Sequence, residues 1–124
     1  MTRGRTNPDF LNGVPELVVL QLLSQRPMYG YELVKAIEHS SGQGLEFGEG
    51  SIYPVLHRLE AEGALASRRV EVAGRSRVVY RVTAPGKRKL SAAIDAWRSV
   101  VRAVGRALDE STSESDEHGR PALA

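Results

Sequence analysis

Three side chains that can donate hydrogen bonds lie close together in the stretch EGSIYPVLHRLEAEGAL, residues 49–65. Tyr53 and His57 are four residues apart and Arg58 follows, so on a helix they fall on one side. An arginine can bind guanine edges or phosphate, and a tyrosine hydroxyl can bind phosphate. Their types and spacing favour recognition of a polyanion. In the alternative without a binding role, Arg58 pairs with Glu62 at i+4 and His57 is simply a surface histidine.

A basic zone surrounds these residues. Residues 58–89 hold nine lysines and arginines against three acids, whereas residues 109–124 hold five acids and one arginine. Concentrated positive charge attracts a polyanion through phosphate neutralisation and counterion release. A solvated, salt-bridged surface would give the same composition, so charge alone does not decide.

The sequence lacks the usual motifs of enzyme active sites. The chain has no G-x-S-x-G elbow, no P-loop and no H-E-x-x-H, and it has no cysteine. His39, His57 and His118 are scattered, and Asp9, Glu16 and Asp95 read as isolated surface carboxylates. We therefore expect no catalytic residues, no metal and no cofactor.

Length and hydropathy limit the class of protein. The 124 residues suit one domain, and the longest apolar run, residues 17–23, is too short to cross a bilayer. The N-terminus has no h-region typical of a signal peptide. We expect a cytoplasmic protein without a membrane partner.

The elements that position the polar face follow from periodicity. Helices are expected from Pro15 to about Gln25, over 31–41, and from Gly50 or Ser51 to Gly63, with a turn at 26–30. In the third helix, Ile52, Val55, Leu56 and Leu59 form an apolar stripe, and Pro54 is tolerated near the start. The opposite face centres on small residues.

Two valine-rich runs, 64–72 and 77–83, predict a β-hairpin whose turn, AGRS, carries Arg75, with Arg77 at the start of the second run. Thr83 can cap a last helix. On that helix, apolar residues recur at steps of four and three, which predicts a seam for a second copy of the chain: Leu90, Ile94, Trp97, Val101, Val104 and Leu108. Residues 109–124 are expected to be disordered.

This order predicts an α+β, mostly α fold: a winged helix-turn-helix with a long C-terminal dimerisation helix. Residues 1–11 form an N-terminal arm, 12–83 the DNA-binding domain, 84–108 the dimerisation helix and 109–124 an acidic tail. In such a domain the third helix enters the major groove, and the hairpin lies along the backbone or in the minor groove.

The runs ELVVLQLLSQRPMYGYELVKAIE, EGSIYPVLHRLEAEGAL and GRSRVVYRVTAPGKRKL resemble the PadR family of bacterial transcriptional regulators over about residues 12–108. The single last helix is similar to the short subfamily. The resemblance implies a homodimer that binds a roughly palindromic DNA operator and usually represses. In some short members a tryptophan on the last helix stacks small aromatic drugs that relieve repression, and Trp97 matches its position.

The candidate residues fall into two sets besides the seam. The set expected to contact DNA is Tyr29, Lys35, Ser51, Tyr53, His57, Arg58, Arg75 and Arg77. The set expected to line a pocket for an aromatic effector is Trp97 together with Phe10, Val14 and Val18 of the partner subunit. A winged-helix adaptor without DNA binding, and a repressor in which Trp97 only packs, remain as alternatives. The operator, the regulated gene, the effector and the sign of regulation stay open.

Overall fold

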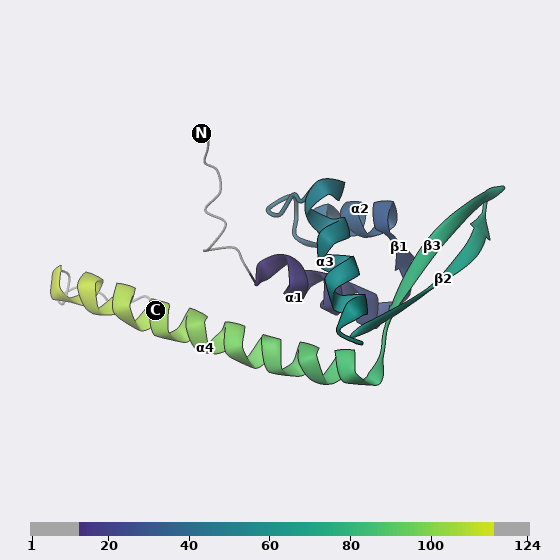
Figure 1. Ribbon diagram of the computed structural model, residues 1–124. Coiled ribbons are helices and arrows are strands. Elements are labelled where there is room, and N and C mark those ends of the chain that lie inside the picture. The colour runs from purple at the N-terminus through teal and green to yellow at the C-terminus, as the bar shows by residue number, and fades with distance from the viewer. Residues whose placement is uncertain (1–12, 116–124) are drawn as a thin grey trace. The chain divides into compact units, whose positions relative to one another are not determined.

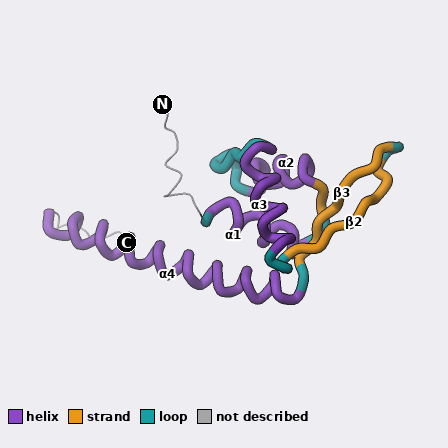
Figure 2. Tube along the Cα trace, viewed as in Figure 1, coloured by secondary structure: helices purple, strands orange, loops and turns teal. Residues whose placement is uncertain are grey.

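The computed structural model describes residues 13–115, with the side chains of 13–109. Its elements follow the chain as α1 (Val14–Gln25), β1 (Met28–Tyr29), α2 (Gly30–Ser40), α3 (Glu49–Ala61), β2 (Leu65–Val72), β3 (Arg75–Val82) and α4 (Ala84–Ser115) (Figures 1 and 2). The predicted order of three helices, a hairpin and a long last helix is confirmed. The described residues form two compact units, the first ending at Ser91 and the second beginning at Ala92.

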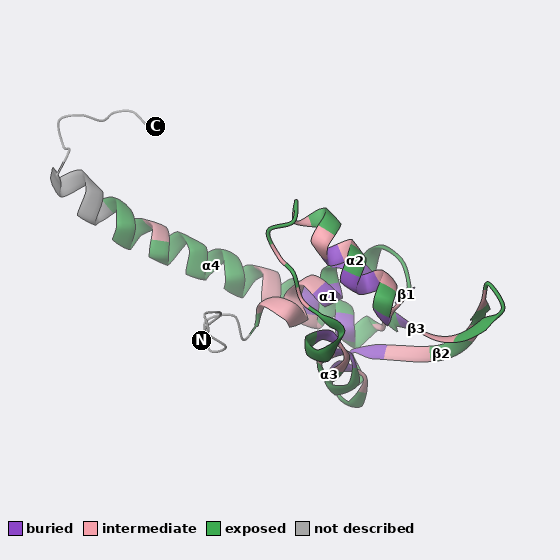
Figure 3. Ribbon diagram, turned by 90° about the horizontal axis from the view of Figure 1, so that it is seen from above, coloured by how far each residue is buried: buried purple, intermediate pink, exposed green. Residues whose placement is uncertain are grey.

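The core of the first unit lies where the first three helices meet. Its largest fully buried side chains come from α1, α2 and α3: Val19, Leu20, Leu33, Ile37, Ile52, Leu56 and Leu59. Burying each of these side chains contributes about 1.5–3 kcal/mol. Val55, expected in the apolar stripe of α3, is only half-buried. The buried stripe is therefore narrower than its spacing predicts, and most of the opposite face of α3 stays exposed (Figure 3).

The segment at 26–30, expected to be a turn, contains strand β1. Met28 pairs with Tyr80 and Tyr29 with Val79 in an antiparallel ladder, which gives a three-stranded sheet in the order β1-β3-β2. A strand of two residues has no periodicity of its own. It forms because β3 supplies the hydrogen-bonding partner, and this explains why the sequence pattern did not reveal it.

The hairpin turn is tighter than expected. β2 and β3 pair continuously from Leu65 with Val82 to Val72 with Arg75, so the loop is only Ala73 and Gly74. Both have positive φ angles, 51° and 78°. Two left-handed residues in a two-residue loop make a type I′ turn, whose twist matches that of the strands. Arg75 and Ser76, expected in the turn, belong to β3.

Helix α3 begins at Glu49, slightly earlier than expected. The amide of Ile52 already bonds the Gly48 carbonyl, at 3.1 Å, so Pro54 lies beyond the first turn. Proline has no amide hydrogen for the carbonyl four residues earlier, which belongs to Gly50. Gly50 is exposed, so water can hydrate that carbonyl.

The start of α4 is held as predicted. The Thr83 hydroxyl accepts a hydrogen bond from the Gly86 amide, 3.1 Å, and so caps the helix. Leu90 is buried within the first unit, with 8% of its surface exposed. The helix continues to Ser115, beyond the boundary expected at Leu108, since extending a formed helix costs far less than nucleating one. The rest of the expected acidic tail, 116–124, lies outside the described residues.

Candidate nucleic-acid interface

The exposed face of α3 carries mostly small side chains. Gly50, Ser51, Pro54, His57 and Ala61 are all exposed there. Small side chains allow another backbone or a groove to approach the helix closely. This face keeps the composition that the sequence predicted, with Ser51, His57 and Arg58 as its exposed polar side chains.

Tyr53, at the side of this face, packs α3 against the helix before it. Its ring lies directly on Gly30, the first residue of α2, where a Cβ atom would collide with the ring and its hydroxyl. The ring of His57 is 6.2 Å from that of Tyr53, centroid to centroid, at 39°. Gly30 therefore leaves room for the Tyr53 ring at the start of α2, and a larger residue at this position would force the ring to move. The sequence pattern alone gave no sign of this contact.

Tyr29 and Arg77 meet at the sheet. The Arg77 guanidinium lies over the Tyr29 ring, with its central carbon 4.7 Å from the ring centroid. The Nε atom of Arg77 is buried and has no hydrogen-bond partner in the described part of the chain. The stack limits the directions in which Arg77 can point, and its remaining donors stay available.

One face of the sheet is strongly basic. Alternate residues of a strand share a face, and the register places four arginines on the face opposite Leu65, Met28 and Tyr80: Arg68, Arg75, Arg77 and Arg81. The other strand residues on this arginine face are alanine, valine and tyrosine, with no acid among them. The sequence indicated the charge of this zone but not its concentration on one face.

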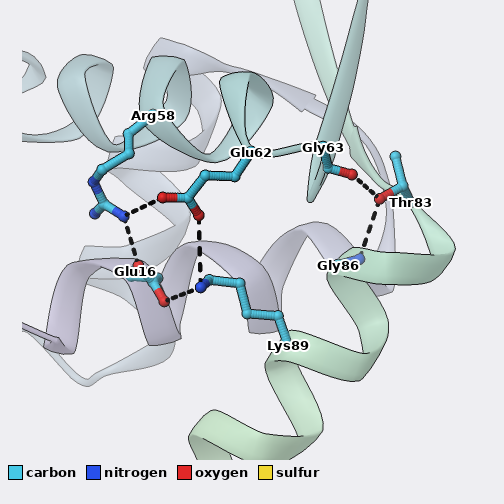
Figure 4. A network of polar contacts seen from close by, with 7 residues as sticks. All are labelled: Glu16, Arg58, Glu62, Gly63, Thr83, Gly86 and Lys89. Atoms are coloured by element: carbon cyan, nitrogen blue, oxygen red, sulfur yellow. Dashed lines mark hydrogen bonds and ion pairs between the residues drawn. The ribbon is translucent and has the colours of Figure 1, made fainter.

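Arg58 has a different environment from the other candidates. Its Nη1 atom lies 2.8 Å from Glu16 and 3.7 Å from Glu62. The hydrogen bond to Glu16 is the largest cause that raises the pKa of Arg58 above its ordinary value, so the guanidinium stays charged. Lys89 approaches the same two carboxylates, at 3.5 Å and 3.6 Å (Figure 4). The ion pair between Arg58 and Glu62, which the sequence offered as an alternative to DNA contact, is therefore present.

Glu16 contradicts its interpretation as an isolated carboxylate. It contacts two cations, Arg58 and Lys89, that lie far from it in the sequence. No local spacing links α1 to these residues, because the packing of α1 against α3 brings them together. Lys35, the remaining candidate of the first unit, is exposed, lies 5.5 Å from the Tyr31 ring and pairs with Glu38 at 3.9 Å.

The residues of the expected seam differ in exposure. Trp97 is 45% exposed and Val101 49%, and Val104 and Leu108 are also exposed, whereas Ile94 is half-buried. Leu90 is instead part of the first unit's interior and has little surface left for a second copy. Val100, not assigned to the seam, is exposed as well. Of the expected pocket residues, Val14 and Val18 are half-buried on α1, and Phe10 lies outside the described residues.

Among the described residues, no group of three or more histidines, acids or cysteines could hold a metal ion. None of the described helices is long and apolar enough to cross a membrane.

Known proteins share this arrangement. Residues 19–92 match the model of the transcriptional regulator PadR-like family. The chain is 35% identical over 83 residues to the transcriptional regulator Rv3488 of Mycobacterium tuberculosis, covering 67% of this chain and 75% of that one.

Solved structures of PadR-type regulators are similar to this chain as well. A PadR family transcriptional regulator from Eggerthella lenta aligns with a TM-score of 0.70 at 32% identity, covering 81% of this chain and 86% of that one. A PadR-like transcriptional regulator from Bacillus cereus aligns with a TM-score of 0.69 at 31% identity, covering 81% and 96%. A regulator from Clostridium thermocellum, TM-score 0.74 at 24% identity, shares the fold. The chain belongs to the PadR-like family of transcriptional regulators, whose function implies DNA binding, and is not an enzyme.

Proposed function

We propose that this protein is a homodimeric repressor that binds a pseudo-palindromic operator in double-stranded DNA. The observation that carries the proposal is the arginine face, four arginines and no acid on one side of the hairpin, together with the exposed, small-residue face of α3. A helix with small exposed side chains fits the major groove, and a basic strand pair fits phosphates or a minor groove.

The proposed contacts divide between the two elements. Ser51, Tyr53 and His57 on α3 supply donors toward bases and phosphates, while Arg75 and Arg77 on β3 neutralise phosphates. Tyr29 supports Arg77 through their stack, and Lys35 adds a phosphate contact from α2. Arg58 is not among the proposed DNA contacts, because its Nη1 atom already faces the carboxylates of Glu16 and Glu62.

The proposed dimer forms along α4. In the second unit of the chain, α4 exposes a run of apolar side chains, among them Trp97, Val100, Val101 and Val104. Exposed apolar surface of this kind is costly in water and marks a contact surface. A second copy of the chain offers the same stripe, so the pair would bury it symmetrically.

We also propose that a small aromatic ligand binds beside Trp97 and relieves repression. An exposed indole offers a flat stacking surface, and the partner subunit's Val14, Val18 and Phe10 are the proposed apolar walls. Trp97 is the chain's only tryptophan, so its fluorescence reports this site directly. Flat aromatic compounds should quench it and raise the dissociation constant for the operator; a repressor without an effector would show neither change.

The first test is a titration against labelled DNA from immediately upstream of the protein's own gene. A scrambled duplex of equal length serves as control, at two salt concentrations. The proposal expects a preference of about 10³-fold or more for the operator, weakening as salt rises. Equal weak binding to both duplexes would place the operator elsewhere or mean nonspecific binding. Absence of binding to either duplex at low salt would support a protein–protein adaptor instead.

A further inference from the structure

Four charged side chains of the first unit form a closed ring, here called the charge ring: Glu16, Arg58, Glu62 and Lys89 (Figure 4). Each carboxylate contacts both cations through different oxygen atoms. Glu16 uses Oε1 for Arg58 and Oε2 for Lys89, and Glu62 uses Oε2 for Arg58 and Oε1 for Lys89. The ring is therefore electrically balanced and adds no net charge to the surface.

The ring joins three helices at one point. Glu16 comes from α1, Arg58 from α3, and Lys89 from the first turns of α4, while Glu62 directly follows the last residue of α3. Isolated exposed ion pairs contribute little to stability, about 0–1 kcal/mol each. A ring that links three elements instead restricts how they can shift against one another, because one displacement breaks several contacts.

A second set of contacts holds the same junction. The Thr83 hydroxyl donates to the carbonyl of Gly63, 2.6 Å, and the Thr83 amide donates to the carbonyl of Ala64, 3.0 Å. Gly86 lies so close to the Ala64 carbonyl that a Cβ atom would collide with it. The segment that ends α3 and the first turn of α4 are thus fixed together independently of the charges.

We propose that the charge ring is a positioning device for DNA binding: it orients α3 by tying its C-terminal end to α1 and to the first turns of α4. Arg58 then acts through Glu16 and Glu62, and not by touching DNA. This inference rests on the proposed function, in which α3 carries the DNA contacts. The predicted dimer seam continues along the same helix that supplies Lys89.

Removing a carboxylate from the ring distinguishes positioning from general electrostatics. Glu16→Gln and Glu62→Gln each delete a negative charge, so electrostatic attraction alone predicts tighter binding to DNA. Positioning predicts weaker binding, by about three- to tenfold. Glu46→Gln is the matched control, since Glu46 is exposed and makes no ion pair in the described part of the chain.

The measurement is operator affinity of the full-length chain by fluorescence anisotropy across a salt series, at a temperature where circular dichroism shows every variant folded. We expect Glu16→Gln and Glu62→Gln to weaken binding with an unchanged salt slope, because no phosphate contact is lost. Lys89→Arg should bind as the wild type does. Adding Glu16→Gln to Lys89→Met should weaken binding no further, since the ring is already open.

Three outcomes overturn the inference: tighter or unchanged binding in both glutamine variants, a loss equal to that of Glu46→Gln, or a salt slope for Arg58→Met lowered by about 0.9 per protomer, the signature of a phosphate contact. Failure of the proposed function looks different. In that case the wild type itself shows no salt-dependent preference for any operator, and the variants have nothing to alter.

Discussion

The guanidinium of Arg77 lies 4.7 Å above the centre of the Tyr29 ring, joining β3 to the residue that precedes α2. Stacking on an aromatic ring fixes an arginine's direction and leaves several of its N–H donors available. A pre-oriented cation loses less side-chain entropy when it binds a phosphate than a freely moving one.

We therefore expect Arg77→Ala to lower the magnitude of the salt slope of DNA binding by about 0.9 per protomer, the value for one lost phosphate contact. Tyr29→Leu should weaken binding a few-fold without changing that slope, because the charge remains. Arg69→Ala is the control: Arg69 is also a hairpin arginine, but it lies on the opposite face of the sheet. Equal losses in Arg69→Ala and Arg77→Ala would contradict a role for the arginine face.

The hairpin turn contains a residue in an unfavourable conformation. Ala73 has φ of 51°, in the left-handed region, which costs a residue with a Cβ atom about 1–2 kcal/mol. Asparagine tolerates this region and Asn-Gly is preferred in type I′ turns, so Ala73→Asn should raise the free energy of unfolding by about 1 kcal/mol. Urea denaturation of the variant and the wild type measures this difference in the free energy of unfolding. Gly74→Ala, at φ of 78°, should change stability in the opposite direction.

The junction before α4 has no room for a methyl group at Gly86. The nearest atom to such a group would be the backbone carbonyl oxygen of Ala64, which cannot rotate away. Gly86→Ala should lower the free energy of unfolding by about 1–3 kcal/mol, as overpacking does. Gly50→Ala in α3 meets nothing within 4 Å and should raise it by up to about 1 kcal/mol. If both variants unfolded at the same urea concentration, the close approach of Gly86 to Ala64 would be wrong.

Alkaline pH should destabilise the fold through Tyr80. Burial, followed by the charge of Glu60 and by Tyr53, raises the pKa of Tyr80 above its ordinary value of 10.0. Above about pH 10 the unfolded chain loses this proton while the folded chain keeps it, so the unfolded state binds fewer protons. Stability present below pH 10 is then lost as pH rises toward the folded pKa.

Chemical denaturation between pH 8 and 11 tests this dependence. The decline from Tyr80 should not exceed about 1.4 kcal/mol per pH unit. Tyr80→Phe, which cannot ionise, should decline less steeply than the wild type. Parallel curves for the two proteins would assign the alkaline loss to other groups.

The exposed stripe of α4 makes the oligomeric state testable. Val101→Asp places a charge where the proposed dimer would bury a valine, and should raise the dimer dissociation constant at least about 100-fold, or ~2.7 kcal/mol. Ala103→Asp adds the same charge to the same helix at an exposed position outside the seam. Analytical ultracentrifugation at low micromolar concentration compares them. A dimeric Val101→Asp variant would rule out the seam.

Much of the architecture was predictable because its signals are local. The stripe Ile52, Leu56 and Leu59 identifies a buried helix face. Thr83 identifies the start of α4, because its hydroxyl caps the amide of Gly86 three residues later. β1 was not predictable, since two residues carry no period and the strand exists only through its pairing with β3. Leu90 matched the heptad spacing, yet the first unit's own interior buries it.

By itself, the sequence determined the order of the helices and the hairpin, the basic character of residues 58–89 and the small exposed face of α3, because each depends on neighbouring residues. Only the tertiary structure decided which charges face outward. It paired Arg58 with Glu16, separated by 42 positions, and gathered four arginines on one side of the sheet. Charge composition is additive along a chain, but whether a cation meets a carboxylate or stays available for another anion depends on how the helices and strands pack.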